Sequence, residues 1–302
     1  MKNQNKPHIK IFYSKDWKDY ELLDTGDGEK LERVGPHTFV RPYEDAFWPK
    51  TLPEKVWNDA TGKFASSKSG SKAGWKFKNK IEGKWEIEYK KIKFLVTPTP
   101  FRHFGFFPEQ AVHWDFIEDK IKEALSARGG QVKFLNLFGY TGIASMFALR
   151  AGAEVTHLDA SKQSLDWAKE NEKLNESQFA GRSMRVIEDD AIKFLEREAK
   201  RGNTYDAIIM DPPKFGRGPK GEVWKLAQMF PQLLSKVKKV LSSDPLFVIV
   251  TSYTTESSTL SVGYALENIV KGFPGGVEAG ELCVHEQSNG RIISLANTAI
   301  YW

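Results

Sequence analysis

The sequence has 302 residues, of which 40% are hydrophobic and 27% charged, and its formal net charge is +5. A chain of this length buries about 75% of its unfolded surface when it folds, which excludes disorder as its main state. The single Cys excludes an internal disulfide framework. The first residues do not resemble a secretory signal peptide, and no apolar run approaches the length of about 18 residues that spans a membrane. We therefore expect a soluble, cytoplasmic protein with no membrane partner.

The sequence pattern of the first third of the chain is typical of a small β-rich domain, which we place at residues 1–97. Short aromatic and β-branched runs alternate there with clusters of Gly, Asp and Lys, as is typical of antiparallel strands and their turns. The predicted strands are His8–Tyr13, Thr38–Arg41, Gly74–Lys78, Trp85–Tyr89 and Lys93–Pro98.

The positive charge of the protein is concentrated in this region. Residues 1–100 contain 20 Lys and Arg against 14 Asp and Glu, and residues 62–93 alone contain ten Lys interleaved with Trp75, Phe77, Trp85 and Tyr89. Lysines neutralise phosphates and aromatic rings stack on bases, a combination found in single-strand binders. A sheet with one face buried through its aromatics and the other solvated by Lys would produce the same alternation, so both interpretations stay open.

Residues 98–302 predict a second domain of the α/β class. A long amphipathic helix is expected over Pro108–Ser126, with Pro at its start. The strands that follow are Lys133–Phe138, Glu154–Asp159, Met184–Glu188, Tyr205–Asp211, Pro245–Tyr253, Glu281–Gln287 and Ile293–Trp302. Helices at Gly142–Ala151, Ser161–Asn175, Asp190–Lys200 and Glu222–Leu241 separate the first five. This alternation predicts a Rossmann-like, seven-stranded, largely parallel sheet that ends in a C-terminal antiparallel hairpin.

The ends of the first three strands carry residues suited to a nucleoside. The first strand runs into Phe138-Gly139-Tyr140-Thr141-Gly142, where two glycines allow a tight turn and a close approach to a ligand. The second ends in Asp159-Ala160-Ser161, and a carboxylate there can accept hydrogen bonds from both ribose hydroxyls. The third ends in Asp189-Asp190-Ala191, where Asp190 can accept from an adenine amino group.

Each of these features also has a structural explanation. A Gly turn often follows a strand, and Asp159 and Asp190 could each cap the next helix. Their ordered combination favours a nucleoside-type cofactor. No Walker sequence follows the first strand, and the Gly-x-Gly-x-x-Gly match at 216–221 follows the fourth strand, which disfavours ATP and a dinucleotide.

The end of the fourth strand is the predicted reaction site. Asp211-Pro212-Pro213-Lys214-Phe215 follows it directly, and the two prolines fix the backbone and delay the next helix. A rigid array of acceptors can hold the N–H groups of a planar base while the aromatic ring stacks on it. The alternative is that Pro-Pro merely ends a buried strand.

The sequence resembles the large-subunit ribosomal RNA methyltransferase family that contains the cytosine-C5 and 7-methylguanine enzymes. The resemblance lies in four segments in this order: 138–142, 159–161, 189–190 and 211–215. The resemblance covers roughly residues 94–255 and implies S-adenosylmethionine as cofactor on a methyltransferase sheet. By this resemblance Gly139, Thr141 and Gly142 wrap the methionine part, Asp159 binds the ribose and Asp190 the adenine. Gln110 stands in the place of the family's Gln-containing lid.

Two departures from the family pattern restrict the chemistry. No RNA-binding module of the usual N-terminal type is recognisable in Met1–Thr97. The fifth strand ends in Val250-Thr251-Ser252-Tyr253, where cytosine-C5 members carry a nucleophilic Cys. The only Cys, Cys283, lies on a later strand and is expected to be a buried apolar residue. The six His and one Cys show no metal-ligand spacing, so no metal is expected.

We therefore expect a methyltransferase that uses S-adenosylmethionine to methylate a nucleobase of ribosomal RNA without a Cys nucleophile. Methylation of a protein or a small molecule is the alternative within the enzyme class. A non-catalytic RNA-binding protein that retains the cofactor fold is the alternative outside it.

Overall fold

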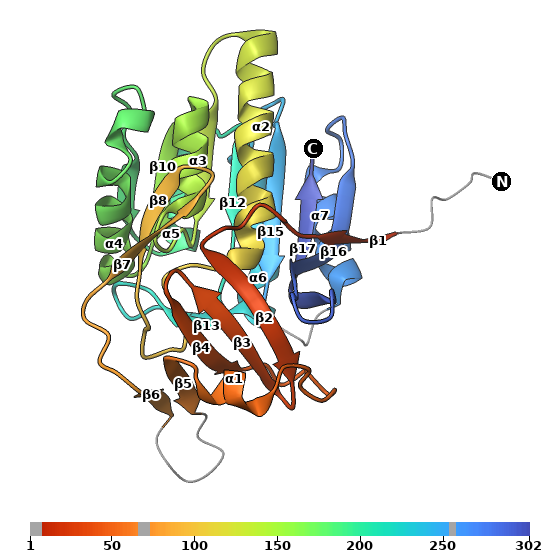
Figure 1. The fold of residues 1–302 in the computed structure, drawn as a ribbon. Coiled ribbons are helices and arrows are strands. Elements are labelled where there is room, and N and C mark those ends of the chain that lie inside the picture. Colours follow the sequence, from red (N-terminus) through yellow and green to blue (C-terminus); the bar gives the residue numbers. More distant parts are fainter. Residues whose placement is uncertain (1–7, 66–72, 254–257) are drawn as a thin grey trace, which may run out of the picture. The chain divides into compact units, whose positions relative to one another are not determined.

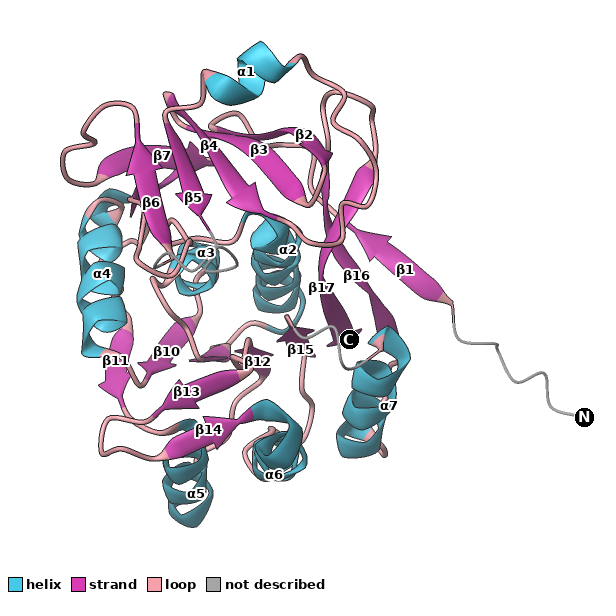
Figure 2. Cartoon of the chain, turned by 90° about the horizontal axis from the view of Figure 1, so that it is seen from below, coloured by secondary structure: helices cyan, strands magenta, loops and turns pink. Residues whose placement is uncertain are grey.

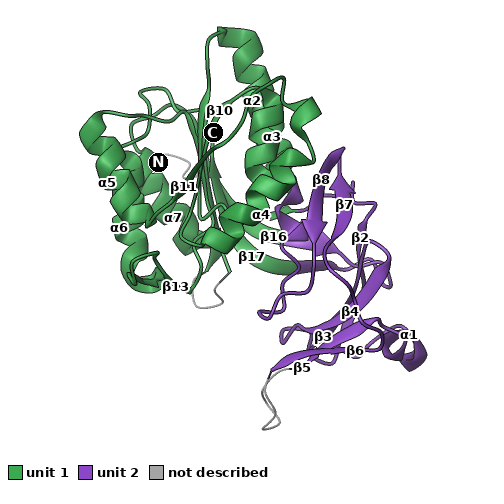
Figure 3. Cartoon of the chain, turned by 90° about the vertical axis from the view of Figure 1, so that its left-hand side faces the viewer, with its two compact units in different colours: residues 1–12, 112–282, 294–302 green, residues 13–111, 283–293 purple. Residues whose placement is uncertain are grey.

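The computed structural model describes residues 8–65, 73–253 and 258–302. The chain divides into two compact units, coloured separately in Figure 3. Unit 1 comprises residues 1–12, 112–282 and 294–302, and unit 2 comprises residues 13–111 and 283–293. The expected domain division at residues 97 and 98 stays a prediction.

Unit 1 is built on a large mixed sheet, which confirms the α/β class (Figure 1). In the described residues its strand order is β1 (Ile9–Phe12), β16 (Val277–His285), β17 (Ile292–Tyr301), β15 (Phe247–Ser252), β12 (Ala207–Met210), β9 (Lys133–Leu137), β10 (Glu154–Asp159) and β11 (Arg185–Glu188). The sheet has one strand more than expected, because β1 pairs in parallel with β16. Without β1, the outer edge of β16 would leave its backbone groups unpaired.

The central strands are parallel, and β17 is antiparallel to β15. All residues of β12 and β15 are buried, as expected for strands covered on both faces. The covering helices are α2 (Ala111–Arg128), α3 (Ile143–Ala151), α4 (Lys162–Lys173), α5 (Ala191–Arg201), α6 (Leu226–Lys238) and α7 (Thr259–Val270). Figure 2 shows α2, α3 and α4 on one face of the sheet and α5, α6 and α7 on the other. None of the helices in the described ranges combines the length and apolar character of a membrane span.

The region around α6 differs from the expected helix at Glu222–Leu241. Residues Phe215–Arg217 form β13, and Val223–Lys225 form β14, which pairs with β13 before α6 begins. The α7 helix was not predicted, although Ser258 supplies an N-cap by accepting from the Ser261 N–H at 3.3 Å.

Unit 2 is rich in β-structure, as expected for the N-terminal part of the chain. Its five-stranded sheet has the order β2 (Tyr20–Gly26), β3 (Glu29–Val34), β4 (His37–Pro42), β5 (Gly62–Ala65) and β6 (Gly74–Phe77). A separate hairpin is formed by β7 (Trp85–Tyr89) and β8 (Ile92–Val96), and α1 (Glu54–Asn58) follows β4. Strands β2, β3 and β5 and helix α1 were not predicted.

A segment from the end of the chain completes unit 2. The Gln287 N–H donates to the Leu22 carbonyl at 2.9 Å, and the Ser288 hydroxyl donates to the Asp24 carboxylate at 2.6 Å. The same carboxylate accepts from the indole N–H of Trp57 at 3.1 Å. These contacts tie residues 283–293 to β2 across more than 250 positions of sequence.

The core of the five-stranded sheet contains a buried ionic cluster centred on Glu32. Arg41 donates to both oxygens of Glu32, at 2.6 and 2.8 Å, and the Tyr20 hydroxyl donates at 2.8 Å. The Lys30 ammonium lies 3.1 Å from the same carboxylate. Burial alone would raise the pKa of Glu32, but the charges of Arg41 and Lys30 outweigh it and lower the pKa to about 2.

We expect Glu32→Gln to destabilise unit 2 by about 3–5 kcal/mol, because it removes the carboxylate that pairs directly with two buried cations. The folded pKa of about 2 lies below the ordinary 4.5 of Glu, so the stabilisation is present above pH 4.5 and is lost as the pH falls toward 2. Urea unfolding between pH 7 and pH 2 measures both effects. Glu82→Gln, at an exposed pair with Lys80, is the control and should change stability by less than about 0.5 kcal/mol. Equal effects of the two substitutions would contradict this account.

Candidate functional site

Four strand ends meet at one edge of the unit 1 sheet. Leu137 of β9 is opposite Leu158 of β10 and Met210 of β12 in the parallel registers. The residues that follow these strands therefore lie beside one another, with neighbouring strands about 4.8 Å apart. Asp159 is opposite Glu188 of β11, and the Asp189 N–H donates to the Asp159 carbonyl at 3.2 Å. The structure thus brings together the predicted segments 138–142, 159–161, 190–191 and 211–215.

The loop after β9 has an unusual backbone. Phe138 and Tyr140 have positive φ angles of 59° and 52°, and Gly142 has a φ of 86°. Left-handed backbone costs a non-Gly residue roughly 1–2 kcal/mol, so other contacts must hold this loop. The Gly139 N–H donates to the Leu158 carbonyl at 2.9 Å. From α4, the buried Asn171 donates to the Thr141 carbonyl, also at 2.9 Å.

The Asp159 carboxylate fixes the same loop from the end of β10. Its Oδ2 accepts from the Tyr140 N–H at 2.9 Å, and its Oδ1 accepts from the Ser161 N–H at 2.8 Å. Ser161 is itself the N-cap of α4, with its hydroxyl accepting from the Ser164 N–H. Burial raises the pKa of Asp159, against the opposing effect of the backbone N–H groups of Ser161, Tyr140 and Ala160. Each oxygen of a carboxylate can accept a second hydrogen bond, so Asp159 retains the capacity to bind hydroxyl donors.

The two glycines of the loop are required by the packing of the chain itself. A Cβ on Gly139 would lie 2.3 Å from Cε1 of His157, and a Cβ on Gly142 would lie 3.0 Å from the Cβ of Ala168. His157 is fully buried in β10, with its Nδ1 3.0 Å from the Ser145 hydroxyl. Burial lowers the pKa of His157 to about 4, so the ring is neutral at pH 7. The expected reason for these glycines was close approach to a ligand, whereas the contacts found are with His157 and Ala168.

Asp190 and Ala191 lie at the start of α5. The Asp190 Oδ1 accepts from the Lys193 N–H at 3.0 Å, which makes Asp190 the N-cap of this helix. The side chain is buried, and Ala191 behind it packs in the hydrophobic core of unit 1. The capping role weighed in the sequence is thus present, and adenine binding by Asp190 stays a prediction.

The segment after β12 contains both buried and exposed residues. Pro212 is buried, whereas Pro213, Lys214 and Phe215 are exposed. The Asp211 N–H lies 3.4 Å from the Leu137 carbonyl, which fixes Asp211 beside the loop 138–142. The indole of Trp224 on β14 donates to the Pro213 carbonyl at 2.6 Å. Its ring packs on Phe138, with centroids 5.0 Å apart.

Two buried hydroxyls stand next to Asp211 at the end of β15. The register Met210 to Val250 places Thr251 beside Asp211. Thr251 and Ser252 are buried, and neither hydroxyl forms a hydrogen bond with the part of the chain that the structure describes. A buried hydroxyl without a partner is costly, so these two hydroxyls favour a ligand that can form hydrogen bonds with them. The sequence signalled this position only by the absence of the family's Cys.

Gln110 belongs to unit 2, where it ends a short 3-10 helix (Pro108–Gln110) immediately before α2. Its side chain is buried. Its expected role as a lid residue over the cofactor stays a prediction.

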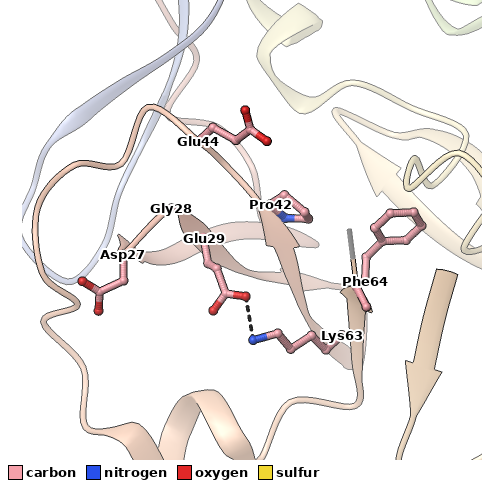
Figure 4. A pocket seen from close by; sticks show the side chains of 8 residues that line it. Asp27, Gly28, Glu29, Pro42, Glu44, Lys63 and Phe64 are labelled. Carbon is pink, nitrogen blue, oxygen red and sulfur yellow. Dashed lines mark ion pairs between the residues drawn. The ribbon is translucent and has the colours of Figure 1, made fainter. Parts of the chain in front are cut away.

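Unit 2 contains a pocket of about 390 Å³, shown in Figure 4. It is lined by Asp27, Gly28, Glu29, Pro42, Glu44, Lys63, Phe64 and Ala65. The Lys63 ammonium pairs with Glu29 at 2.6 Å. Burial raises the pKa of Glu29, but Lys50 and Lys63 outweigh it and lower the pKa overall, so this carboxylate is charged at pH 7. With three carboxylates and one lysine, this pocket is unsuited to phosphates.

Sequence reasoning missed the residues that support the loop. His157, Asn171 and Trp224 touch it from β10, α4 and β14. Only the fold shows that they converge.

We expect Gly139→Ala to destabilise unit 1 by about 1–3 kcal/mol, because the new methyl overlaps the His157 ring. In the double variant with His157→Ala, the cost should be smaller than the sum of the two single costs. Thermal unfolding of the four proteins of this cycle measures the coupling. Gly276→Ala, whose Cβ would meet nothing within 4 Å, is the control with an effect below about 0.5 kcal/mol. Additive costs in the cycle would refute the proposed contact.

Comparison with known proteins agrees with this geometry. A crystal structure of a SAM-dependent methyltransferase from Agrobacterium tumefaciens has 39% identity and a TM-score of 0.89, and covers 98% of this chain and 94% of that chain. A protein from Streptococcus mutans described as a SAM-dependent methyltransferase has a TM-score of 0.71 over 95% of this chain and 76% of that chain. At 16% identity, this second likeness shows the fold alone.

Curated relatives match over shorter stretches. A ribosomal RNA large subunit methyltransferase K/L from Desulfotalea psychrophila is 37% identical over 40% of this chain and 16% of its own length. A ribosomal RNA large subunit methyltransferase I from Aeromonas salmonicida is 32% identical over 43% of this chain and 30% of its own length. This chain therefore spans less than a third of either relative. The sequence model of the S-adenosylmethionine-dependent methyltransferase family matches residues 71–262, more than half of the chain. The protein belongs to the S-adenosylmethionine-dependent methyltransferases.

Proposed function

We propose that this methyltransferase modifies a nucleobase of ribosomal RNA and does so without a Cys nucleophile. The observation that carries the proposal is the position of Asp159 and Asp211 on either side of the loop 138–142, at one edge of the sheet. One carboxylate can bind a nucleoside cofactor while the other faces the acceptor. The names of the curated relatives support ribosomal RNA as the acceptor.

The residues present fit the cofactor. The Asp159 carboxylate is partly buried, accepts the backbone N–H groups of Tyr140 and Ser161 and has acceptor sites left for the two ribose hydroxyls. In the proposal, Gly139, Thr141 and Gly142 hold the methionine part and Asp190 the adenine. The proposed cofactor site is completed by Phe138, Tyr140, Ala160, Ser161, Ala191 and Gln110. When bound, S-adenosylmethionine supplies a methyl group on a positively charged sulfur.

The proposed acceptor side consists of Asp211, Pro212, Pro213, Lys214 and Phe215. The rigid Pro-Pro backbone holds the Asp211 carboxylate at the sheet edge, where it can accept an N–H of the base. A nitrogen nucleophile needs no prior covalent attack, so the absence of a Cys after β15 fits this acceptor. Cys283 is buried in β16. The proposed reaction needs no metal, because methyl transfer from a sulfonium requires only an aligned nucleophile and a dry pocket. The proposed location of the reaction is the cytoplasm.

The acceptor class is tested by transfer of radiolabelled methyl groups into an extract from cells that lack this protein. We expect acid-precipitable label that ribonuclease removes and protease does not. Label removed only by protease would replace RNA with a protein acceptor. Tight cofactor binding without methyl transfer to RNA or protein would indicate that the acceptor is a small molecule or that the protein binds RNA without catalysis.

We expect Asp159→Asn to weaken cofactor binding by about 10²–10⁴-fold, because two charge-assisted hydrogen bonds of roughly 1.5–3 kcal/mol each are lost. Isothermal titration with S-adenosylmethionine measures the affinity. Asp166→Asn, at an exposed carboxylate on α4, is the control and should bind as the original protein does. An unchanged affinity in Asp159→Asn would remove Asp159 from the site.

Cofactor affinity should also depend on pH through Asp159. The pKa of this carboxyl is raised above the ordinary 3.8, and the protonated form loses acceptor capacity. We therefore expect binding to weaken as the pH falls, beginning at a higher pH than for an ordinary Asp. Titrations from pH 8 down to pH 3.8, the ordinary pKa of Asp, measure this, and a flat profile over that range would contradict it.

We expect Asp211→Ala to abolish methyl transfer while leaving cofactor affinity within about twofold, because Asp211 faces the acceptor in the proposal. Parallel titration and methyl-transfer assays separate the two effects. Unchanged transfer would show that Pro-Pro merely ends the strand.

A further inference from the structure

The hairpin of β13 and β14, labelled in Figure 2, follows the segment 211–214. The register of its two strands gives it two chemically different faces. Phe215 is opposite Lys225, Gly216 opposite Trp224, and Arg217 opposite Val223. Side chains alternate along a strand and cross-strand partners share a face. The inner face is therefore Gly216 and Trp224, and the outer face is Phe215, Arg217, Val223 and Lys225.

The inner face fixes the orientation of the hairpin. Trp224 is only 4% exposed, and its contacts with the Pro213 carbonyl and the Phe138 ring hold β14 against the cofactor loop. The Leu226 N–H donates to the Lys214 carbonyl at 3.0 Å and closes the base of the hairpin. The outer face is therefore directed away from Phe138.

The outer face joins exposed apolar surface to positive charge. Phe215 is 58% exposed and Val223 is 48% exposed. Arg217, Lys220 and Lys225 are exposed as well, and within the described ranges no carboxylate forms an ion pair with any of the three. Glu222, the single acidic residue of the stretch 214–225, pairs instead with Lys193 of α5.

We propose that this outer face, together with Lys220 in the turn between β13 and β14, binds a single-stranded segment of the acceptor RNA. This inference rests on the proposed function. The cations contact phosphates, and the exposed ring of Phe215 stacks on a base. Because Phe215 lies on the face opposite Trp224, the base that it stacks on is a neighbour of the methylated base, which lies at Asp211. The hairpin thus connects recognition of the strand to the acceptor position.

The charge component is tested with the triple variant Arg217→Gln, Lys220→Gln, Lys225→Gln and a fluorescein-labelled oligouridylate. We expect an affinity loss of at least about tenfold. The slope of log affinity against log salt should fall by about 2, since each single-strand phosphate contact contributes about 0.7. S-adenosylmethionine affinity, measured by titration calorimetry, should be unchanged.

A matched control removes the same charge from the opposite edge of the sheet. Lys173, Lys200 and Lys238 are exposed in the last turns of α4, α5 and α6, the ends from which the chain enters the next strands. The triple variant of these residues to Gln has the same net charge as the hairpin variant. We expect it to retain the RNA affinity and the salt slope of the original protein.

The stacking component is tested at Phe215. Phe215→Ala should weaken oligouridylate binding by about 5- to 150-fold without changing the salt slope, because a base loses its stacking partner but no phosphate loses its cation. Phe215→Trp should retain the affinity. Equal binding by Ala and Trp variants would exclude stacking on Phe215.

The outcomes separate this inference from the proposed function. Equal losses in the two triple variants would overturn the hairpin as the binding face, as would oligouridylate binding by the hairpin variant at the original affinity. In either case continued methyl transfer into RNA would leave the proposed function standing. If the original protein binds no oligouridylate and transfers label only to protein or small molecules, both proposals fail.

Discussion

The candidate site depends on the partly buried Asp159 carboxylate, which pairs with backbone N–H groups and with no cation in the part of the chain that the structure describes. Asp159 accepts the backbone N–H groups of Tyr140 and Ser161, and so joins the end of β10 to the cofactor loop and to the start of α4. The loop needs this support because Phe138 and Tyr140 hold a left-handed backbone that is unfavourable by roughly 1–2 kcal/mol each. A loop held in this way is already in place before a ligand arrives, which reduces the ordering cost of binding.

The contrast with Glu32 in unit 2 shows what a binding carboxylate requires. Arg41, Lys30 and Tyr20 surround Glu32, and its pKa falls to about 2. The Glu32 carboxylate is fully engaged by these partners and contributes to the stability of unit 2. Among the described residues, Asp159 accepts backbone N–H groups and no cation, its pKa is raised, and its oxygens have acceptor sites left for hydroxyl donors. Burial without a counter-ion is unfavourable for stability alone, and it becomes favourable once a ligand donates hydrogen bonds.

Local pattern predicted the parts of the fold that depend on neighbouring residues. Strand β10 has the expected bounds, Glu154–Asp159, because an apolar run ends there in Asp and a capping Ser. Two features depend on distant partners and could not be read this way. Strand β1 pairs with β16 across about 270 residues. The apolar spacing of Val223, Trp224 and Leu226 fits a helix, and only pairing with β13 makes the first two part of a strand.

In the candidate site, too, local sequence pattern predicted some features, whereas others depend on contacts that only the fold shows. One such contact joins the loop 138–142 to the segment 211–215. The order of Gly139, Asp159 and Asp211 along the chain predicted which strand ends would meet, since parallel strands end at one edge. The sequence could not show that Trp224 packs on Phe138 while donating to Pro213. This one side chain contacts both the loop 138–142 and the segment 211–215. A displacement of either segment must therefore move Trp224 or break its contacts, so the positions of the two segments are coupled.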